Sequence, residues 1–463
     1  MNRIFYITII FLLSIINLNY DFSQKPWTLE KCITYALEHN IKIDKQRISS
    51  KIAGNNYRQA KAEKLPDLSI SGNHSIDHIS DNIQSGSFSA NSSVTLFNGR
   101  KIHFKRQKEN YDFRAQLQNV ERLKHIISLN ITSAYLNILL QKALKKKAQN
   151  QIKITNAQLQ RIKGLIKAGE LSKDKLTEMK AQKAKEKYKI TLVRNRLRTA
   201  KIHLIQLLDI DTIGTFSIKT PSIEITTQDH IKSPVQKIYQ KALNLPRIQM
   251  KKYQIQSAKK QLNLSKSRLY PSVSLNFGYG TNYSNEAQEV VNTSITQTIV
   301  GHINKDQSKP VYKKNVQKKF KDKPVIEQFE DNAAGNIALT FTIPIFNKFY
   351  TQYNINNSKL HVKYKKYELE HTKNQLYEDI QKAYNDARAA NKNYIAAKKQ
   401  VKYMKQAYQI AEEKFQVGMI NTIEYKRTKN DLSHAQNELA RKKYQYIFKV
   451  KILDFYKGHK LTF

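Results

Sequence analysis

The chain has 463 residues, with 80 lysine and arginine residues against 37 aspartate and glutamate residues, so its formal net charge is +43. Because the lysines are spread over every segment with helical patterning instead of forming one stripe, the charge indicates a compositional bias and argues against nucleic-acid binding. The sequence contains one cysteine and no nucleotide-binding glycine loop, nucleophile elbow or metal-ligand cluster, so neither an enzyme nor a cofactor is predicted.

Residues 1–22 have the pattern of a secretory signal peptide. Arg3 precedes an apolar run from Ile4 to Ile16, and polar residues follow. The apolar run is shorter than a comfortable membrane span, with a retained anchor as the alternative interpretation. We therefore expect a mature chain that begins near residue 23.

A helical stretch is expected from about Ala36 to Leu65, and a pair of strands is expected within residues 65–97. In these strands, and in a second pair within residues 270–346, apolar residues occupy every other position over about ten residues, which is typical of membrane-spanning barrel strands. The apolar positions of the four strands are Leu68, Ile70, Ile76; Phe88, Ala90, Val94, Leu96; Val273, Leu275, Phe277, Tyr279; and Ile337, Leu339, Phe341, Ile343.

A very long helix is predicted after the first strand pair. No proline lies between residues 67 and 220, and 71 residues separate Phe97 from Gly169. One helix of that length would extend about 100 Å at 1.5 Å per residue. Its apolar positions step by three, four or seven, as in packed antiparallel helices. They are Phe113, Leu117, Val120, Ile127, Ile131, Ala134 and Ile138.

Gly169 marks the predicted tip of a helical hairpin, because glycine readily adopts the left-handed conformation that ends a helix. A returning helix is expected to run from there to about Leu208, with Ser172 as its N-terminal cap. Together with the stretch before Leu65, this helix matches the length of the long one. Two stacked shorter helices beside one long helix are therefore expected.

The same order of elements recurs in the second half of the chain. Leu96-Phe97-Asn98 returns as Ile345-Phe346-Asn347, 249 positions later, and Gly169 returns at the same offset as Gly418. A fixed offset indicates duplicated architecture. Asn421 is the cap expected for the second returning helix.

The duplication divides the chain into a first repeat, residues 23–231, and a second repeat, residues 232–463. Upstream of the strands the offset is 205 instead of 249, since Leu65-Pro66 recurs as Tyr270-Pro271. The second repeat therefore carries an insertion of 44 residues, which we place at residues 283–330 between its two strands.

The insertion is rich in lysine and contains Pro310 and Pro324, so a packed core of its own is not expected. We predict first a mobile loop outside the cell, and second a cap that contacts anionic lipopolysaccharide. The lysines available for such contacts are Lys313, Lys314, Lys318, Lys319 and Lys321.

Four strands from one chain leave two open sheet edges. In lipid, each unpaired backbone N–H or C=O group at such an edge would cost several kcal/mol. Closure of the sheet therefore requires strands from other copies of the chain.

The chain resembles the outer-membrane efflux, or TolC-like, proteins over nearly its whole mature length. Each matching motif is short, but their order, spacing and duplication are specific together. The motifs are Trp27-Thr28-Leu29-Glu30-Lys31-Cys32-Ile33-Thr34-Tyr35-Ala36-Leu37, Leu65-Pro66, Tyr270-Pro271, Leu96-Phe97-Asn98, Ile345-Phe346-Asn347, Ala168-Gly169-Glu170-Leu171-Ser172 and Val417-Gly418-Met419-Ile420-Asn421.

The resemblance implies a mostly α fold with membrane β structure, located in the outer membrane with a periplasmic helical extension. Duplicated antiparallel helical hairpins would form a periplasmic α-barrel, and a homotrimer would share a twelve-stranded β-barrel in outer-membrane lipid. The implied function is a passive efflux or secretion channel that works with a periplasmic membrane-fusion adaptor and an inner-membrane RND, ABC or MFS pump. The alternative is a coiled-coil scaffold of the cell envelope, which would not explain the paired strands.

Two sets of functional residues are expected at the hairpin tips, the first from the isolated glycines and apolar residues at these turns and the second from the resemblance. Residues expected to contact the adaptor are Gly169, Leu171, Ser172, Gly418, Met419, Ile420 and Asn421. Residues expected to gate the channel entrance are Asp174, Phe415, Glu424 and Arg427. Glu424 matches an acidic gate position of the family, but Arg427 stands where a second acid would complete the ring, and Phe415 cannot donate the hydrogen bond of a gate tyrosine. Ordinary hairpin surface is the alternative interpretation for the four gate residues.

Overall fold

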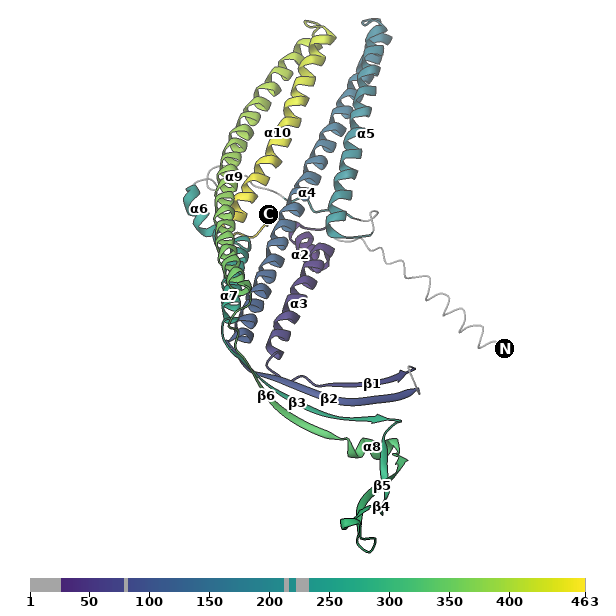
Figure 1. Cartoon of the computed structure of the whole chain (residues 1–463). Helices are drawn as coiled ribbons and strands as arrows, with labels where there is room; N and C mark the ends of the chain where they lie inside the picture. Colours follow the sequence, from purple (N-terminus) through teal and green to yellow (C-terminus); the bar gives the residue numbers. More distant parts are fainter. Residues whose placement is uncertain (1–25, 79–81, 212–215, 222–232, 463) are drawn as a thin grey trace, which may run out of the picture. The chain divides into compact units, whose positions relative to one another are not determined.

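The computed structural model of the chain describes residues 26–78, 82–211, 216–221 and 233–462 (Figure 1). The expected signal peptide and the expected boundary between the two repeats lie outside these described residues. Within the described part of the chain, no helix combines the length and the apolar character needed to cross a membrane.

The chain divides into two compact units. The first, here named the helical unit, lies within Met1–Ala53, Phe113–Gln254 and Lys365–Phe463. The second, here named the sheet unit, lies within Gly54–Asp112 and Ile255–Tyr364. Each repeat therefore contributes residues to both units.

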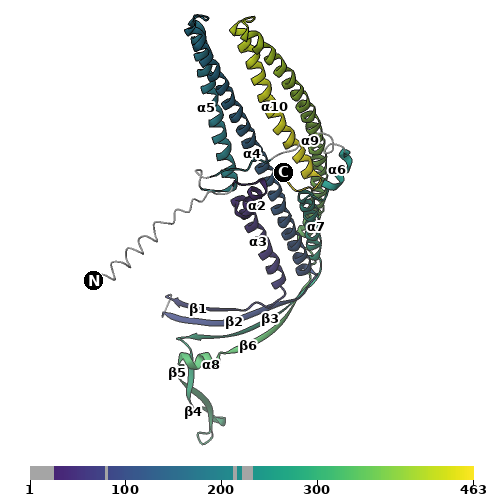
Figure 2. The same cartoon turned by 180° about the vertical axis from the view of Figure 1, so that it is seen from behind.

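The helical unit contains two hairpins of matching length. Helices α4 (Lys101–Lys167) and α9 (Tyr350–Gln416) each have 67 residues, and part of each belongs to this unit. The returning helices α5 (Asp174–Leu208) and α10 (Thr422–Tyr456) each have 35 residues. In both views α5 runs beside α4, and α10 beside α9 (Figure 2). The prediction of two long hairpins is confirmed.

Shorter helices precede each strand pair. They are α2 (Leu29–His39) and α3 (Ile41–Ala62) in the first half, and α6 (Val235–Ala242) and α7 (Pro246–Ser267) in the second. The first of them begins seven residues before the expected Ala36, because the Thr28 hydroxyl caps it by accepting a hydrogen bond from the Lys31 N–H at 3.2 Å. Asn40 separates α2 from α3, and its side-chain amide donates to the Leu207 carbonyl at 3.0 Å.

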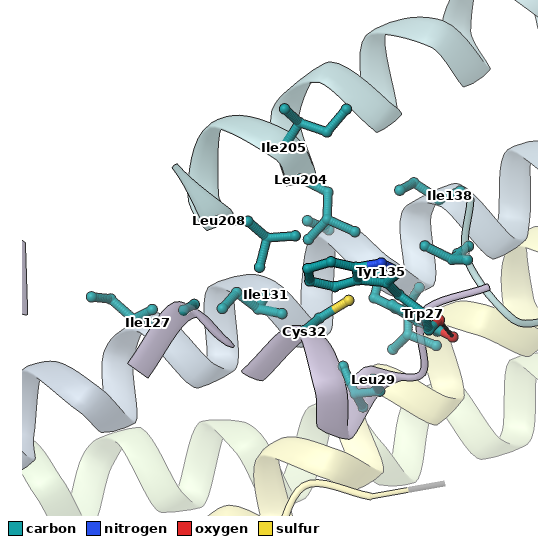
Figure 3. Packing of buried hydrophobic residues seen from close by; sticks show 14 of the residues in the cluster. Trp27, Leu29, Cys32, Ile127, Ile131, Tyr135, Ile138, Leu204, Ile205 and Leu208 are labelled. Carbon is teal, nitrogen blue, oxygen red and sulfur yellow. Dashed lines mark hydrogen bonds between the residues drawn. The ribbon is translucent and has the colours of Figure 1, made fainter. Parts of the chain in front are cut away.

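The largest apolar core joins α2, α4 and α5 (Figure 3). Ile131 and Leu204 are fully buried in it, and burial of each such side chain contributes about 1.5–3 kcal/mol. Tyr135 lies in the same core, and its hydroxyl donates to the Lys219 carbonyl at 2.6 Å. This bond satisfies a polar group that would otherwise be buried without a partner.

A second core, built around α6, α7, α9 and α10, repeats the first. Ile43 and Ile131 have Ile248 and Ile380 as their counterparts in the second half of the chain, and all four are 0% exposed. Matched burial at matched positions is what a structural duplication requires. The predicted duplication is therefore visible in the packing as well as in the spacing.

The sheet unit contains a four-stranded antiparallel sheet in the order β1-β2-β3-β6. Its strands are β1 (Ser69–Asp77), β2 (Ile83–Asn98), β3 (Ser272–Ser284) and β6 (Ala334–Thr342), as predicted from the period-two pattern. Strands β1 and β6 form the two edges, so each has one row of backbone groups without a partner strand within the described chain. Every residue of these edge strands is exposed.

The insertion at 283–330 is not the mobile loop that we ranked first. It forms a hairpin of β4 (Gln288–His302) and β5 (Pro310–Asp322), joined through the 3-10 turn η1 (Ile303–Lys305) and followed by α8 (Val325–Asp331). The interpretation failed because lysines and prolines concealed a period-two pattern in this segment. Gln328 of α8 is 1% exposed and binds Ser284, accepting from its N–H at 2.8 Å and donating to its carbonyl at 2.9 Å, which anchors the insertion to β3.

Candidate functional site

The two hairpin tips have the same backbone conformation. Gly169 and Gly418 have φ angles of +79° and +76°, in the left-handed region that favours glycine. At the first tip the Glu170 N–H donates to the Leu165 carbonyl at 2.9 Å, and at the second the Met419 N–H donates to the Lys414 carbonyl at 2.9 Å. Both are the long bond of a Schellman motif, so the predicted helix reversal at each glycine is confirmed.

The two tips differ in their caps. The Asn421 carboxamide oxygen accepts from the Glu424 N–H at 2.9 Å and caps α10, as predicted. Ser172 does not cap α5, which was the expectation, because Lys173 holds the N-cap position and the Ser172 hydroxyl donates to Asp174 instead. The second tip therefore has the better satisfied helix end.

The apolar tip residues also divide into two kinds. Met419 is 75% exposed, as expected for a contact residue, and Ile420 is partly buried. Leu171 was expected to be exposed, but it is partly buried, because it packs against the buried Leu159 and Met179 of α4 and α5. Two exposed apolar residues of the second tip were missed by the sequence analysis, namely Val417 at 68% and Ile423 at 72%.

Among the described residues, no hydrogen bond or ion pair joins any two of the four expected gate residues. Glu424 and Arg427 are both exposed, and within the described residues no ion pair joins them. Asp174 is exposed, and its pKa is lowered chiefly because its carboxylate accepts a hydrogen bond from the Ser172 hydroxyl. Phe415 is partly buried and stacks on Tyr425, with 4.6 Å between the ring centroids.

A buried polar cluster connects α4, α9 and α10 near the tips, and the sequence analysis missed it. The Lys429 ammonium donates to the Thr155 hydroxyl at 2.9 Å and to the Gln158 carboxamide oxygen at 3.1 Å. The Gln158 amide in turn donates to the Tyr425 hydroxyl, which lies 2.9 Å from the Tyr408 hydroxyl. Lys429 and Tyr425 are only 4% and 1% exposed, so the bonds are shielded from water.

Nearby carboxylates balance the positive charge of Lys429 in this cluster only in part. Desolvation lowers the pKa of Lys429, and the carboxylates of Glu186 and Glu412 oppose that effect only in part. Burial raises the pKa of Tyr408 and of Tyr425. Closer to the tips, Glu178 of α5 pairs with Lys426 of α10 at 3.1 Å, so charged as well as neutral contacts join the two hairpins.

A cavity of about 520 Å³ opens beside this cluster, between the two tips. Its wall includes Gln158, Leu171, Phe415 and Tyr425. Among the described residues, no group of three or more histidine, cysteine, aspartate or glutamate side chains could hold a metal ion. The arrangement at the tips consists of hydrogen-bonding and apolar groups suited to contact between helical hairpins.

A family model described as outer membrane efflux protein matches residues 32–209 and 238–458, which is most of the chain. The chain belongs to the outer membrane efflux protein family. An outer membrane efflux protein is a transport channel and not an enzyme, and it resides in the outer membrane with its helices extending into the periplasm. The non-channel scaffold that we considered as an alternative is therefore not supported.

Solved structures support the fold of this outer membrane efflux protein. CusC, in a study of its folding and transmembrane channel formation, aligns with a TM-score of 0.71 at 16% identity, covering 94% of this chain and 92% of CusC. The outer membrane protein VceC from Vibrio cholerae aligns with a TM-score of 0.71 at 16% identity, covering 93% and 96%. The CmeC outer membrane channel of Campylobacter jejuni has the same TM-score and identity, covering 93% and 85%. A comparison with curated protein sequences found no match.

Proposed function

We propose that this outer membrane efflux protein is one subunit of a homotrimeric export channel, in which three copies close a twelve-stranded barrel. The open edges β1 and β6 carry this proposal. A sheet placed in lipid has to satisfy its edge N–H and C=O groups, and pairing β1 of one copy with β6 of the next does so without further chain. The two repeats, at 23–231 and 232–463, would then each supply two strands and one hairpin.

Disulfide cross-linking between the edge strands tests the proposed closure. Single cysteines would be placed along β1 and β6, for example Ser71→Cys with Thr340→Cys, and scanned in register. The native Cys32 does not interfere, because burial raises the pKa of its thiol to about 12. We expect covalent trimers in outer-membrane extracts for some registers. Pairs along β2 and β3, which are already neighbours in one chain, serve as the control, and exclusively monomeric products at every β1–β6 register would contradict the proposal.

We further propose that the tips dock onto a periplasmic adaptor, which couples the channel to an inner-membrane RND, ABC or MFS pump. Support comes from the exposed Val417, Met419 and Ile423, which together leave apolar surface on a turn in water. Docking against helices of another protein would bury that surface.

Substitution of the tip glycine tests the docking. Gly418→Val forces a β-branched residue into the left-handed region, at a cost of about 1–2 kcal/mol, although nothing lies within 4 Å of the added Cβ. The tip backbone should therefore shift, and export should fall while trimers remain in the membrane. Gly164→Val is the matched control, because Gly164 lies within α4, has similar space and does not need a left-handed backbone. Normal export in Gly418→Val cells would contradict docking at this tip.

A further inference from the structure

The β4–β5 hairpin has one apolar face. Its register places Val290 opposite Phe320, Ile295 opposite Val316 and Ile299 opposite Tyr312. Residues directly opposite each other point to the same side of a sheet, and so do residues two apart along a strand, so these six side chains share one face. They are between 46% and 63% exposed.

The opposite face of the hairpin is polar along its middle, and the exposed Val311 lies on it near the turn. It carries Ser294 opposite Gln317 and Thr296 opposite Asn315. A two-stranded hairpin is marginally stable in water on its own, and this one leaves its whole apolar face without a partner within the described chain. The face therefore requires an occupant.

Lysines are interleaved with the apolar pairs. Lys318 opposite Thr293 and Lys314 opposite Gln297 lie on the apolar face, between its three apolar pairs. Lys313 and Lys319 lie on the other face. All four lysines are exposed, and within the described residues none of them forms an ion pair.

We propose that this face lies on the membrane surface and binds the anionic phosphate groups of lipid headgroups. Its apolar side chains would enter the boundary between headgroups and acyl chains, while the lysine stems lie along that boundary and carry their ammonium groups to the phosphates. A second copy of the same face fits poorly, since it would bring Lys314 and Lys318 against their own equivalents. Charge complementarity thus favours an anionic lipid surface over self-association.

The position of the hairpin agrees with this occupant. It joins the end of β3 to the start of β6, which is the end of the sheet away from α7 and α9, and Gln328 fixes it to β3. If the sheet crosses the membrane, the hairpin emerges at the outer surface, where lipid headgroups lie beside it. The inference therefore rests on the proposed insertion of the sheet into the membrane.

Fluorescence quenching by brominated lipid in vesicles containing the full-length channel tests the inference. Trp27 is the only native tryptophan and is buried in the helical unit, so it gives a constant background. Ile295→Trp reports on the apolar face, and Thr296→Trp, one residue further along, is the matched control for the polar face. We expect brominated phosphatidylglycerol to quench Ile295→Trp and to leave Thr296→Trp unchanged.

The lysine contribution is measured in the Ile295→Trp background. Lys314→Gln with Lys318→Gln should raise the fraction of phosphatidylglycerol needed for half-maximal quenching by about fivefold or more at low salt. Lys185→Gln with Lys187→Gln removes the same charge from α5 and should change nothing. Equal effects of the two pairs would show that net charge, and not this face, attracts the lipid, and would overturn the inference.

Two further outcomes would also overturn it. Equal quenching at Ile295→Trp and Thr296→Trp would show that neither face is selected, and protection of Ile295→Trp from aqueous acrylamide without lipid quenching would show that protein covers the face. Ion conductance measured on the same vesicles reports insertion. Conductance without lipid quenching contradicts only this inference, whereas absence of conductance contradicts the proposed channel and the inference with it.

Discussion

At the scale of single residues, Lys429 is a buried ammonium group whose direct hydrogen-bond partners include no carboxylate. It is 4% exposed, and its direct hydrogen-bond partners, Thr155 and Gln158, are neutral. A buried charge without a charged partner is costly, and the lowered pKa of Lys429 expresses that cost. The burial of this ammonium between two hairpins should therefore be measurable as pH-dependent stability.

The sign of that dependence follows from the lowered pKa. Below the folded-state pKa both states hold the proton and the penalty is fully present. Between that value and the ordinary 10.5 the unfolded state binds more protons, so stability should rise with pH through this window. Tyr408 and Tyr425 oppose this rise near pH 10, because burial raises the pKa of each and the unfolded state therefore loses their protons first. Both tyrosines are kept in a Lys429 variant, so comparison of that variant with the parent isolates the contribution of the lysine.

We predict that Lys429→Met increases the free energy of unfolding near neutral pH by about 1–2 kcal/mol, and that this gain over the parent shrinks towards pH 10. Urea unfolding in detergent, followed by circular dichroism at both pH values, measures both effects. Lys402→Met, at an exposed position of α9, is the control and should leave the slope unchanged. An unaltered slope in Lys429→Met would show that Lys429 is not the group responsible.

Glu424 and Arg427 give a second prediction at this scale. They do not pair within one chain, so their expected role in closing the entrance depends on contacts between copies. Exposed ion pairs contribute only about 0.2–1 kcal/mol each, so such a closed state would open easily. Channels with Glu424→Ala or Arg427→Ala should conduct more than the parent in planar bilayers. Glu424→Arg combined with Arg427→Glu should restore the parent conductance, and equal conductance in all variants would assign both residues to the surface.

Sequence reasoning at this scale succeeded where a residue acts on the backbone within a few positions of itself. Gly169, Gly418 and Asn421 adopt the predicted conformations because their requirements are local. The contact of Lys429 with Thr155 arises only when helices distant in sequence pack together, and the packing of Leu171 depends on how the tip folds back onto α4 and α5. No spacing rule predicts either.

At the scale of elements, the two returning helices provide a matched pair that differs in one cap. Loss of a side-chain cap costs about 1 kcal/mol, which corresponds to about a fivefold change in local opening. We predict that Asn421→Ala increases hydrogen exchange at the Glu424 amide by about that factor. Ser172→Ala should leave the Lys175 amide unchanged, because the Lys175 N–H donates to the Ser172 backbone carbonyl, which alanine retains. Equal increases at both tips would contradict the assignment of the caps.

The elements also show where periodicity is sufficient. The long helices and the four strands β1, β2, β3 and β6 were predicted, because a consistent period of 3.6 or 2 extends over many residues. The β4–β5 hairpin also has a period of two. Lysines stand between its apolar pairs, so the apolar residues do not form an unbroken alternation in the sequence. Composition suggested disorder where the strand register provides an ordered hairpin.

At the scale of the whole molecule, the side of the membrane on which the insertion lies reports which way the sheet is oriented, because the insertion joins β3 to β6 at one end of the sheet. Within the insertion, the turn between β4 and β5 is exposed, and its Asn304 and Lys305 lie outside the strand ladder, so a protease can reach this backbone without opening the paired strands. Lys309 and Lys323 each precede a proline, and trypsin cuts lysine–proline bonds inefficiently. Lys305 is therefore the expected cleavage site.

We predict that trypsin added to intact cells cuts after Lys305 and leaves the long helices whole. The remaining insertion lysines in β5 should resist, because cutting there requires the paired strands to open first. Lys305→Gln should abolish the cleavage, and this variant is the control for cutting elsewhere. Fragments identified by mass spectrometry give the site. If Lys305 were cut only in permeabilised cells, the hairpin would lie in the periplasm, and the orientation of the sheet that underlies both the channel proposal and the lipid contact would have to be reversed.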